Sequence, residues 1–285
     1  MSSLTDLIKG IVTGLLICAA GSGVFFIQTR IDRIRKPGEA IVRELMYFPS
    51  GKFLGAVTVG YDNLAADLVW LRAIQYYGEH RMTDAKYEYL GHILDILTTL
   101  DPRFVGAYTF GSLLLSDDAK EPHRALELLD KGIRNNPEDW RIPFTKGFIN
   151  YVFLRDYFKA GKYFEMASRL DGAPGMAARF ASFAYQKGGD RMTAISLWTE
   201  LYLRSDNEIE KVMALRYIKE LVAERLEEKV GEYRAKFGRY PYRLSELVDV
   251  GIVRRLPVTP DGDTFVFNYG RKRVEPASGP IKIED

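Results

Sequence analysis

Apolar residues recur at helical spacing along most of this chain of 285 residues. In the stretch ALELLDKGIRNNP, Ala125, Leu129 and Gly132 lie at offsets of zero, four and seven, which return to the same face of a helix. Pro137 follows five residues later, and its ring and missing amide hydrogen end a helix. The pattern predicts a short amphipathic helix with a sharp C-terminal end.

This unit is repeated along the chain. Ala160 follows Ala125 by 35 residues and Ala194 follows Ala160 by 34. The helix predicted before each of them also repeats, with residues at offsets of zero, three, four and seven: Ala107, Phe110, Gly111 and Leu114; Phe144, Gly147, Phe148 and Tyr151; Ala178, Ala181, Ser182 and Tyr185. A period near 34 residues, with small side chains where paired helices cross, predicts a solenoid of helix-turn-helix units whose apolar stripes cover one another.

With these residues the segment 104–206 resembles the tetratricopeptide repeat (TPR) family. The first unit departs from the family pattern by two extra residues near Glu121 and Pro122, and the last two units lack the terminal proline. Two further helical stretches, 64–81 and 87–102, are interpreted as a divergent fourth unit. The resemblance implies a protein that binds other proteins along a concave inner surface.

The N-terminal region contains a candidate membrane span. Residues 10–29 read GIVTGLLICAAGSGVFFIQT and carry no charged side chain; a helix of this length extends about 30 Å, enough to cross the hydrocarbon core. A cleaved signal peptide is the alternative, because Ala19, Ala20 and Gly21 offer small residues for cleavage. The apolar run continues past that point, which favours an uncleaved anchor.

Small residues recur every four positions within this span, at Gly10, Gly14, Cys18 and Ser22. Such a strip lets a second helix approach closely, so it is a candidate helix-pairing face. The alternative is that small residues are common in spans in any case.

The C-terminal part changes character after a long predicted helix at 207–238. A short helix at 244–250, a turn at Pro260-Asp261-Gly262 and the alternating run TFVFNY at 264–269 predict a small module with a β-hairpin. The order F-G-x-Y-P, L-x-x-L-V, G-I-V and L-P-x-x-P-x-G, followed by alternating aromatic residues, resembles the C-terminal part of the major pseudopilins of type II secretion. The pseudopilins' remaining body is absent, so the resemblance implies a borrowed module.

The sequence therefore predicts a mainly α protein, a TPR-like helical solenoid preceded by one transmembrane helix and followed by a small α+β C-terminal module. The predicted parts are an N-terminal tail (1–9), the transmembrane helix (10–29), a juxtamembrane connector (30–51), a divergent helical repeat (52–103), the TPR-like repeats (104–206), a capping helix (207–238) and the hairpin module (239–285).

Composition and candidate chemistry favour binding over catalysis. The 40 basic and 38 acidic residues give no overall field that would attract nucleic acid. The single cysteine, Cys18, excludes an internal disulfide and a multi-cysteine metal site. His80, His92 and His123 lie in separate segments without metalloprotease spacing. We predict no catalytic residue, no metal site and no cofactor.

One acidic pair needs separate consideration. Asp261 and Asp263 follow Pro260 on either side of a glycine. A simple turn is the interpretation favoured by this composition, and a calcium loop is the alternative.

The repeat register also predicts the residues of a concave groove for an extended peptide or a partner helix. One unit would contribute Met176, Arg179, Phe183 and Gln186, and the unit before it would contribute Ile142, Thr145, Ile149 and Val152.

The predicted function is a membrane-anchored scaffold that binds protein partners in the assembly or maintenance of a cell-envelope complex of pilus or secretion type. The expected location is a bacterial-type inner membrane. Basic residues after the span favour a cytoplasmic soluble domain, whereas the pseudopilin-like module favours a periplasmic one. Two alternatives stay open: a permanent structural subunit of a large membrane complex, and an enzyme whose site lies in residues 47–77 with Lys52, Asp62 and Asp67.

Overall fold

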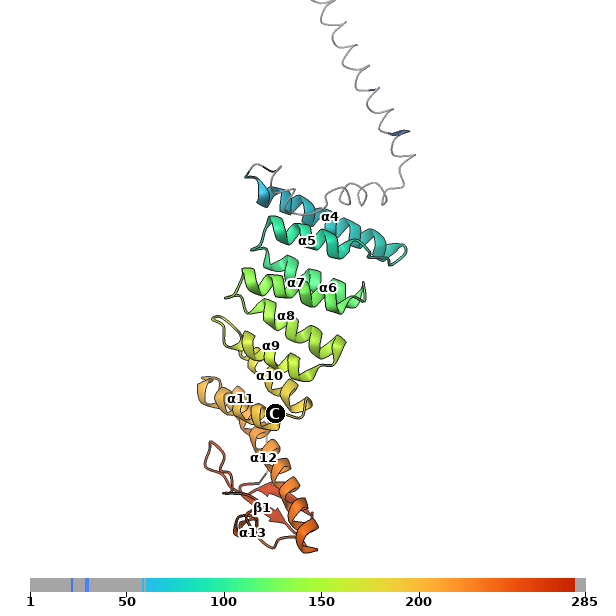
Figure 1. Ribbon diagram of the computed structural model, residues 1–285. Helices are drawn as coiled ribbons and strands as arrows, with labels where there is room; N and C mark the ends of the chain where they lie inside the picture. The colour runs from blue at the N-terminus through green and yellow to red at the C-terminus, as the bar shows by residue number, and fades with distance from the viewer. Residues whose placement is uncertain (1–21, 23–28, 31–57, 59, 280–285) are drawn as a thin grey trace, which may run out of the picture. The chain divides into compact units, whose positions relative to one another are not determined.

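The computed structural model describes residues 22, 29–30, 58 and 60–279. Over this part the protein is mainly α, a TPR-like helical array that ends in a two-stranded β-hairpin (Figure 1). The chain divides into two compact units, residues 1–102 and 103–285. The first contains α4 (Asp62–Met82) and α5 (Leu90–Leu100). The second contains α6 (Val105–Asp117), α7 (Pro122–Asn135), α8 (Arg141–Ile149), the π-helical turn η1 (Asn150–Leu154), α9 (Tyr157–Ser168), α10 (Gly175–Lys187), α11 (Arg191–Arg204), α12 (Glu208–Phe237), α13 (Ser245–Asp249), β1 (Phe265–Asn268) and β2 (Arg273–Pro276).

The predicted membrane span falls almost entirely outside the described residues, which include only Ser22 and Thr29 of the segment 10–29. Among the helices that are described, none is both long and apolar enough to cross a bilayer. The span, its direction and the pairing role of Gly10, Gly14 and Cys18 remain predictions of the sequence.

In the first unit, α4 and α5 form a helix pair around the buried Tyr76. The Tyr76 hydroxyl donates to the carbonyl oxygen of Lys86 at 3.2 Å and accepts from the amide of Tyr89 at 3.3 Å. Loss of hydration raises the pKa of this phenol. The turn between the two helices is therefore tied to α4 by a side chain from its inner face.

Polar side chains define where the later helices begin. Asp156 accepts a hydrogen bond from the amide of Lys159 at 3.0 Å, and Asp190 accepts from the amide of Thr193 at the same distance. Asn207 caps α12 by accepting from the amide of Ile209 at 2.9 Å. Each cap satisfies an amide that has no partner inside its own helix. The helix boundaries therefore follow from single residues that can be identified in the sequence.

The second unit confirms the predicted repeat. Helices that follow one another along the chain pack together from α6 to α12, and α6 also packs on α8. In the second helix of each unit the recurring positions are buried: Ala125, Leu129 and Gly132; Ala160, Phe164 and Ala167; Ala194, Trp198 and Leu201. The sequence period therefore reflects residues that lie between stacked helices.

Glycines set the closest approach between helices. A Cβ on Gly132 would lie 2.8 Å from the ring of Tyr108, one on Gly147 would lie 2.7 Å from the ring of Phe164, and one on Gly161 would lie 2.9 Å from the ring of Tyr185. In each case an aromatic ring occupies the space that a side chain would need. The helices thus come closest at these glycines, where a ring from another helix occupies the space beside the backbone.

The last long helix, α12, buries two opposite faces. Tyr217, Leu221 and Glu224 lie at helical spacing on the face that includes its contacts with α10 and α11. Leu226, Val230 and Tyr233 lie on the opposite face, where α13 and the β-hairpin add to the same core. The C-terminal module therefore covers the surface that a further repeat would otherwise cover.

A buried lysine helps to hold this module in place. Lys219 of α12 is 5% exposed, and its Nζ lies 2.8 Å from Asp261 Oδ2 and 2.7 Å from Asp263 Oδ2. The ammonium group of Lys219, with the Ser278 hydroxyl, lowers the pKa of Asp263 to about 2. Asp261 and Asp263 therefore neutralise a cation of the protein itself, which argues against the calcium-loop alternative because that ammonium would repel a metal ion.

The hairpin differs in one respect from the prediction. β1 pairs with β2 in antiparallel register, with Phe267 opposite Val274, so its loop is Tyr269–Lys272 and not the turn at Pro260-Asp261-Gly262. That turn precedes β1 and directs Asp261 toward Lys219. The segment of β2 is rich in charged residues, RVEP, and has no hydrophobic alternation from which a strand could be predicted.

The glycine positions lead to a stability prediction. Gly147→Ala should destabilise the protein by about 1–3 kcal/mol, because the ring of Phe164 is fully buried between other rings and cannot move aside. Gly231→Ala in α12 is the matched control, since nothing lies within 4 Å of the added carbon; it should stabilise by about 0.5–1 kcal/mol through helix propensity. Urea denaturation of both variants measures the difference, and equal effects would contradict this account of the packing.

The lysine cluster leads to a second prediction. Lys219→Met should reduce the hydrogen-exchange protection of the β1 and β2 amides roughly tenfold or more, because two carboxylates would then face each other without a cation. Lys229→Met is the control on the same helix, since Lys229 pairs with the exposed Glu232 at the protein surface. If both variants lower protection equally, the buried cluster has no special role.

The depressed pKa of Asp263 leads to a third prediction. A carboxyl group whose folded pKa is about 2 stabilises the fold above its unfolded pKa of about 3.9, and that stability is lost as pH falls through the folded value. Protection of the hairpin amides, corrected for intrinsic exchange, should therefore decline between about pH 4 and pH 2. Asp263→Asn should show a smaller decline over this range; an unchanged decline would exclude Asp263 as its source.

Candidate functional site

A hollow of about 440 Å³ opens along α10. Four elements contribute its lining: η1 contributes Tyr151, α10 contributes Phe180, Phe183, Gln186 and Lys187, α11 contributes Arg191, and α12 contributes Glu224. Its principal wall is thus a row of α10 side chains spaced three, six and seven residues from Phe180, which lie on one side of the helix.

The aromatic side chains of the hollow are held by other rings. Phe183 meets the rings of Trp198 and Tyr217 edge-on, at centroid distances of 5.1 Å and 5.0 Å. Trp198 and Tyr217 stack on each other at 4.8 Å. Edge-to-face and offset stacking are the favoured geometries of aromatic pairs. The apolar surface of the hollow is therefore rigid and continuous with the core.

Phe180 is held in the same way on the other side of the hollow. Its ring lies 5.7 Å from that of Phe144 and 5.4 Å from that of Phe164. Both contacts come from the preceding repeat, so the hollow spans the junction of two repeats and depends on their stacking.

The π-helical turn η1 brings Tyr151 to the hollow. The turn ends at Arg155, whose φ of 55° is left-handed, and Asp156 then caps α9. Tyr151 packs edge-on against Tyr157 at 5.3 Å. A π turn inserts an extra residue into a helix and is frequent at functional sites. Here it turns the Tyr151 side chain toward the hollow, whereas regular helical spacing would assign Tyr151 to internal packing.

The charged residues of the hollow are arranged asymmetrically. Lys187 lies over two tyrosine rings, 5.1 Å from the centroid of Tyr151 and 4.7 Å from that of Tyr157, and the interaction with Tyr157 raises the pKa of this lysine. Arg191 instead forms ion pairs with Glu224 at 3.3 Å and Glu228 at 2.6 Å. The lining of the hollow thus combines an exposed ammonium group, that of Lys187, with an ion-paired contact between α11 and α12.

Two of the predicted groove residues, Phe183 and Gln186, line this hollow. Met176 is partly exposed on α10 but does not belong to the lining. Arg179 pairs with Glu210 at 3.2 Å, so it joins α10 to the start of α12. Val152 is 45% exposed at the η1 turn.

For the other three predicted residues the structure corrects the assignment. Ile142 and Ile149 are fully buried and Thr145 is 8% exposed, so none of them offers a surface to a partner. Ile142 would contact a Cβ on Gly132 at 3.1 Å, which places it between α7 and α8. The predicted register for α8 is therefore wrong for a groove, because these side chains face the interior of the array.

The sequence pattern does not identify the remaining lining residues. It assigns Tyr151 to internal packing, and it does not mark Phe180, Lys187, Arg191 or Glu224 as groove residues. The spacing Phe180, Phe183, Lys187 is the available signal, since three such residues on one helix side form an aromatic strip that ends in a cation.

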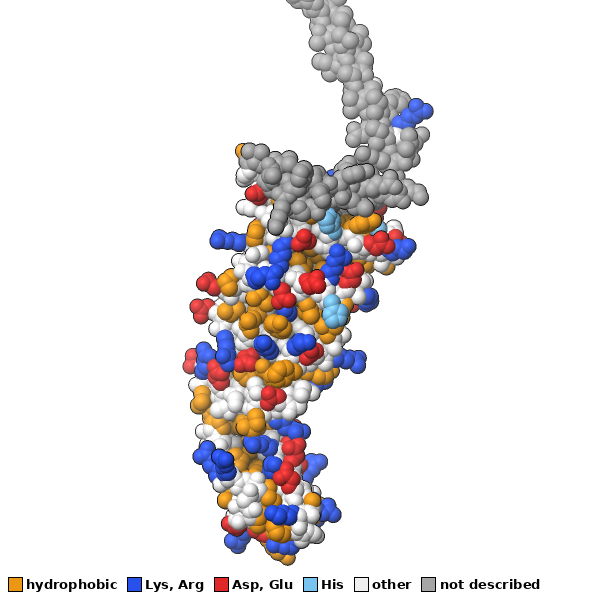
Figure 2. Space-filling view, in the orientation of Figure 1, with side chains coloured by type: hydrophobic (Ala, Val, Ile, Leu, Met, Phe, Trp, Pro, Cys, Tyr) orange, Lys and Arg blue, Asp and Glu red, His pale blue; other side chains and the backbone are white. Residues whose placement is uncertain are grey.

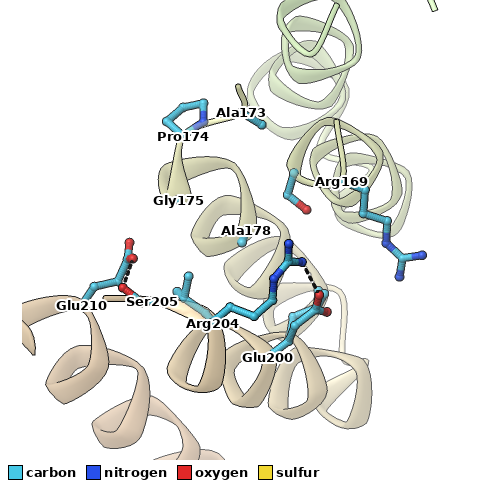
Figure 3. Close-up of a pocket in the computed structure, with 12 residues that line it drawn as sticks. Arg169, Ala173, Pro174, Gly175, Ala178, Glu200, Arg204, Ser205 and Glu210 are labelled. Atoms are coloured by element: carbon cyan, nitrogen blue, oxygen red, sulfur yellow. Dashed lines mark hydrogen bonds and ion pairs between the residues drawn. The ribbon is translucent and has the colours of Figure 1, made fainter. Parts of the chain in front are cut away.

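A second, smaller hollow of about 200 Å³ lies where the α9–α10 and α11–α12 connections meet (Figure 3). Glu210 accepts from the Ser205 hydroxyl at 2.7 Å, and Arg204 pairs with Glu200 at 2.9 Å. A Cβ on Gly175 would lie 2.6 Å from the Glu210 carboxylate, so this acidic group sits at the first residue of α10. An acidic group at a helix N-terminus is stabilising, and we interpret this hollow as a joint between repeats.

The other candidate residues do not form a catalytic centre in the described part of the chain. The three histidines lie on α4, α5 and α7, and His80 Nδ1 lies 2.6 Å from Asp84. Asp62 accepts a hydrogen bond from Thr58, while Asp67, five residues along α4, is exposed on a different side of the helix. No group of three metal-binding side chains comes together within the described residues, and Lys52 lies outside them.

The described C-terminal module leaves the hollow open. It packs against the Leu226 and Val230 face of α12, whereas Glu224 lines the hollow from the opposite face of the same helix. On the face drawn in Figure 2, acidic and basic side chains are interspersed and do not separate by sign. The hollow differs from this surface by its aromatic lining, in which Phe180 and Phe183 are held by other rings.

No protein-family model matches the chain, and no curated protein matches it. Among solved structures, the chain is similar to the MamA protein, with 15% identity, 67% of this chain and 98% of that chain covered, and a TM-score of 0.40. It is also similar to pilF of Pseudomonas aeruginosa, with 16% identity, 68% and 87% covered, and a TM-score of 0.37. The TPR-like array is shown by the chain's own helices and repeated buried positions.

Proposed function

We propose that this protein is a scaffold that binds a protein partner in the aromatic hollow along α10. The observation that carries the proposal is the row Phe180, Phe183, Gln186 and Lys187, which is open on one side and fixed by rings of the core on the other. The mechanism is reversible binding, without a chemical step.

The geometry suits an extended peptide or a partner helix. Aromatic rings that are already held in place lose little conformational freedom when a ligand binds. The favourable free energy of contact with them is therefore not offset by an entropic cost of ordering the site. Exposed surface at Phe183 and Phe180 would accept an apolar side chain of the partner, and the ammonium group of Lys187 would interact favourably with an acidic group beside it. The proposal therefore specifies an apolar segment with a neighbouring carboxylate.

A membrane anchor would strengthen such binding. The apolar segment 10–29, if it spans a bilayer, confines the scaffold to one surface, and partners in that membrane then meet it at a raised effective concentration. The resemblance of residues 237–269 to pseudopilins supports a cell-envelope complex of pilus or secretion type. It also supports a periplasmic location, whereas the basic residues that follow the span support a cytoplasmic one.

The alternative functions differ from this proposal in testable ways. A permanent structural subunit would hold its partner without exchange. An enzyme with its site in residues 47–77 would depend on Asp62 and Asp67, which lie on different sides of α4. The scaffold is preferred because the hollow is preformed and accessible.

Site-specific cross-linking tests the proposal. A photoreactive amino acid at Gln186, inside the hollow, should give a discrete protein adduct in native membranes, identified by mass spectrometry. The same group at Lys162, exposed on α9, is the control and should give no such adduct.

A groove-filling variant makes the test sharper. Adding Lys187→Trp to the Gln186 cross-linking protein should abolish the adduct, because the bulky ring occupies the hollow. It should lower the thermal unfolding temperature only slightly, because Lys187 is exposed and loses only its contacts with two tyrosine rings. Equal adducts at Gln186 and Lys162, or an adduct that survives groove filling, would contradict binding in this hollow.

A further inference from the structure

The helix α4 has apolar residues on two opposite sides. Its inner side is buried, with no side chain more than 7% exposed, and consists of Ala66, Val69, Ala73 and Tyr76. Its outer side carries Leu64, Leu68, Leu71 and Ile74, which are 58%, 58%, 55% and 45% exposed. Spacings of three and four residues place these four side chains along one strip of the helix, which we call the outer strip.

Such a strip is unusual for the exposed side of a helix in a repeat array. An exposed helix face is normally polar, because an apolar one promotes association. Here Arg72 and Arg81 flank the strip, while Asp67 and Gln75 lie within it between the exposed apolar side chains. The outer strip therefore has the properties of a contact surface.

We propose that the outer strip pairs with the same strip of a second copy of this chain, with the two α4 helices antiparallel about a two-fold axis at Leu71. This pairing places residue i opposite residue 142−i, so Leu64 faces Gly78, Leu68 faces Ile74, and Leu71 faces its own copy. Nothing lies within 4 Å of the position of a Cβ on Gly78. Leu64 of each copy therefore lies opposite Gly78 of the other copy. The glycine leaves room for the leucine, so the two helices can approach closely.

The polar residues within the strip agree with this register. Asp67 falls opposite Gln75. The Gln75 side-chain oxygen accepts from Arg72 at 3.1 Å, so its amide nitrogen is oriented as the donor for the partner's carboxylate. A parallel pairing would instead place each Asp67 beside its own copy, and like charges in such positions repel. An antiparallel pair is therefore complementary in shape and in charge.

The predicted span supports the same symmetry. Gly10, Gly14, Cys18 and Ser22 form a candidate pairing face within it. Pairing of two spans through these small residues would relate the two copies by a two-fold axis, as the antiparallel α4 pair does. The contact from Leu64 to Gly78 would be about 21 Å long, and a single helix strip of this length buries less than the area of about 800 Å² per partner found in stable complexes. Confinement to a membrane would compensate for this small area.

Disulfide trapping tests the register directly in the full-length protein, with Cys18→Ser removing the native thiol. A mixture of Leu64→Cys and Gly78→Cys proteins should form a covalent dimer on mild oxidation, while each alone should form little. Asn63→Cys mixed with Gly78→Cys is the control, because residue 63 is exposed outside the strip. Self-linking by Leu64→Cys alone would show a parallel pair and overturn the proposal.

Disruption of the strip provides an independent measurement. Leu68→Glu should weaken self-association, measured by energy transfer between labelled copies in liposomes, by about tenfold or more, because it places an unpaired charge in an apolar contact. The helical circular dichroism signal should be unchanged, since Leu68 is exposed. Unchanged self-association in this variant would overturn the proposal.

Other occupants of the strip give distinct results. A cross-link within one chain, between Leu71→Cys and Leu45→Cys of the preceding apolar segment, would show that the chain covers its own strip. Protection of Leu71→Cys from a water-soluble thiol reagent only in liposomes, without dimers, would show contact with lipid. Either result overturns the proposal.

Discussion

Close contact between helices through glycine is the constraint on which the rest of the array depends. Gly132, Gly147 and Gly161 each leave room for an aromatic ring from another helix, and an added Cβ would lie only 2.7 to 2.9 Å from that ring. The rings fill the space that the missing side chains leave, and the helices approach until the rings are buried. The three glycines occupy different positions of the repeat, and the period of about 34 residues comes from the buried sets that begin at Ala125, Ala160 and Ala194.

The same aromatic residues give the protein its binding surface. Phe164, Phe180, Phe183 and Trp198 take part in ring contacts that begin in the core and end at the hollow. Because each ring is oriented by its neighbours, the hollow has a defined shape before any partner binds. Packing and recognition therefore draw on the same aromatic residues, which explains why such residues are abundant in a chain that shows no catalytic centre in its described part.

The end of the array illustrates how an exposed repeat face can be covered. α12 buries a second apolar face under α13 and the hairpin, and Lys219 is neutralised there by Asp261 and Asp263. α4 also has two apolar sides, but in the described structure its outer strip is exposed. This contrast between two helices of similar pattern is the basis for assigning α4 to self-association.

The sequence by itself determined the helical array, because the periodicity of apolar residues and the recurring small residues act locally and between neighbours. It also located α12, whose Asn207 cap and Gly238 end are local signals. Only the tertiary structure decided which side of α8 faces solvent, since Ile142 and Ile149 have the same spacing as groove residues would. The ion pairs of Lys219, 42 and 44 residues from their partners, likewise depend on how the module folds back onto α12. Local spacing specifies which residues share a helix face, but what covers that face depends on contacts between distant parts of the chain.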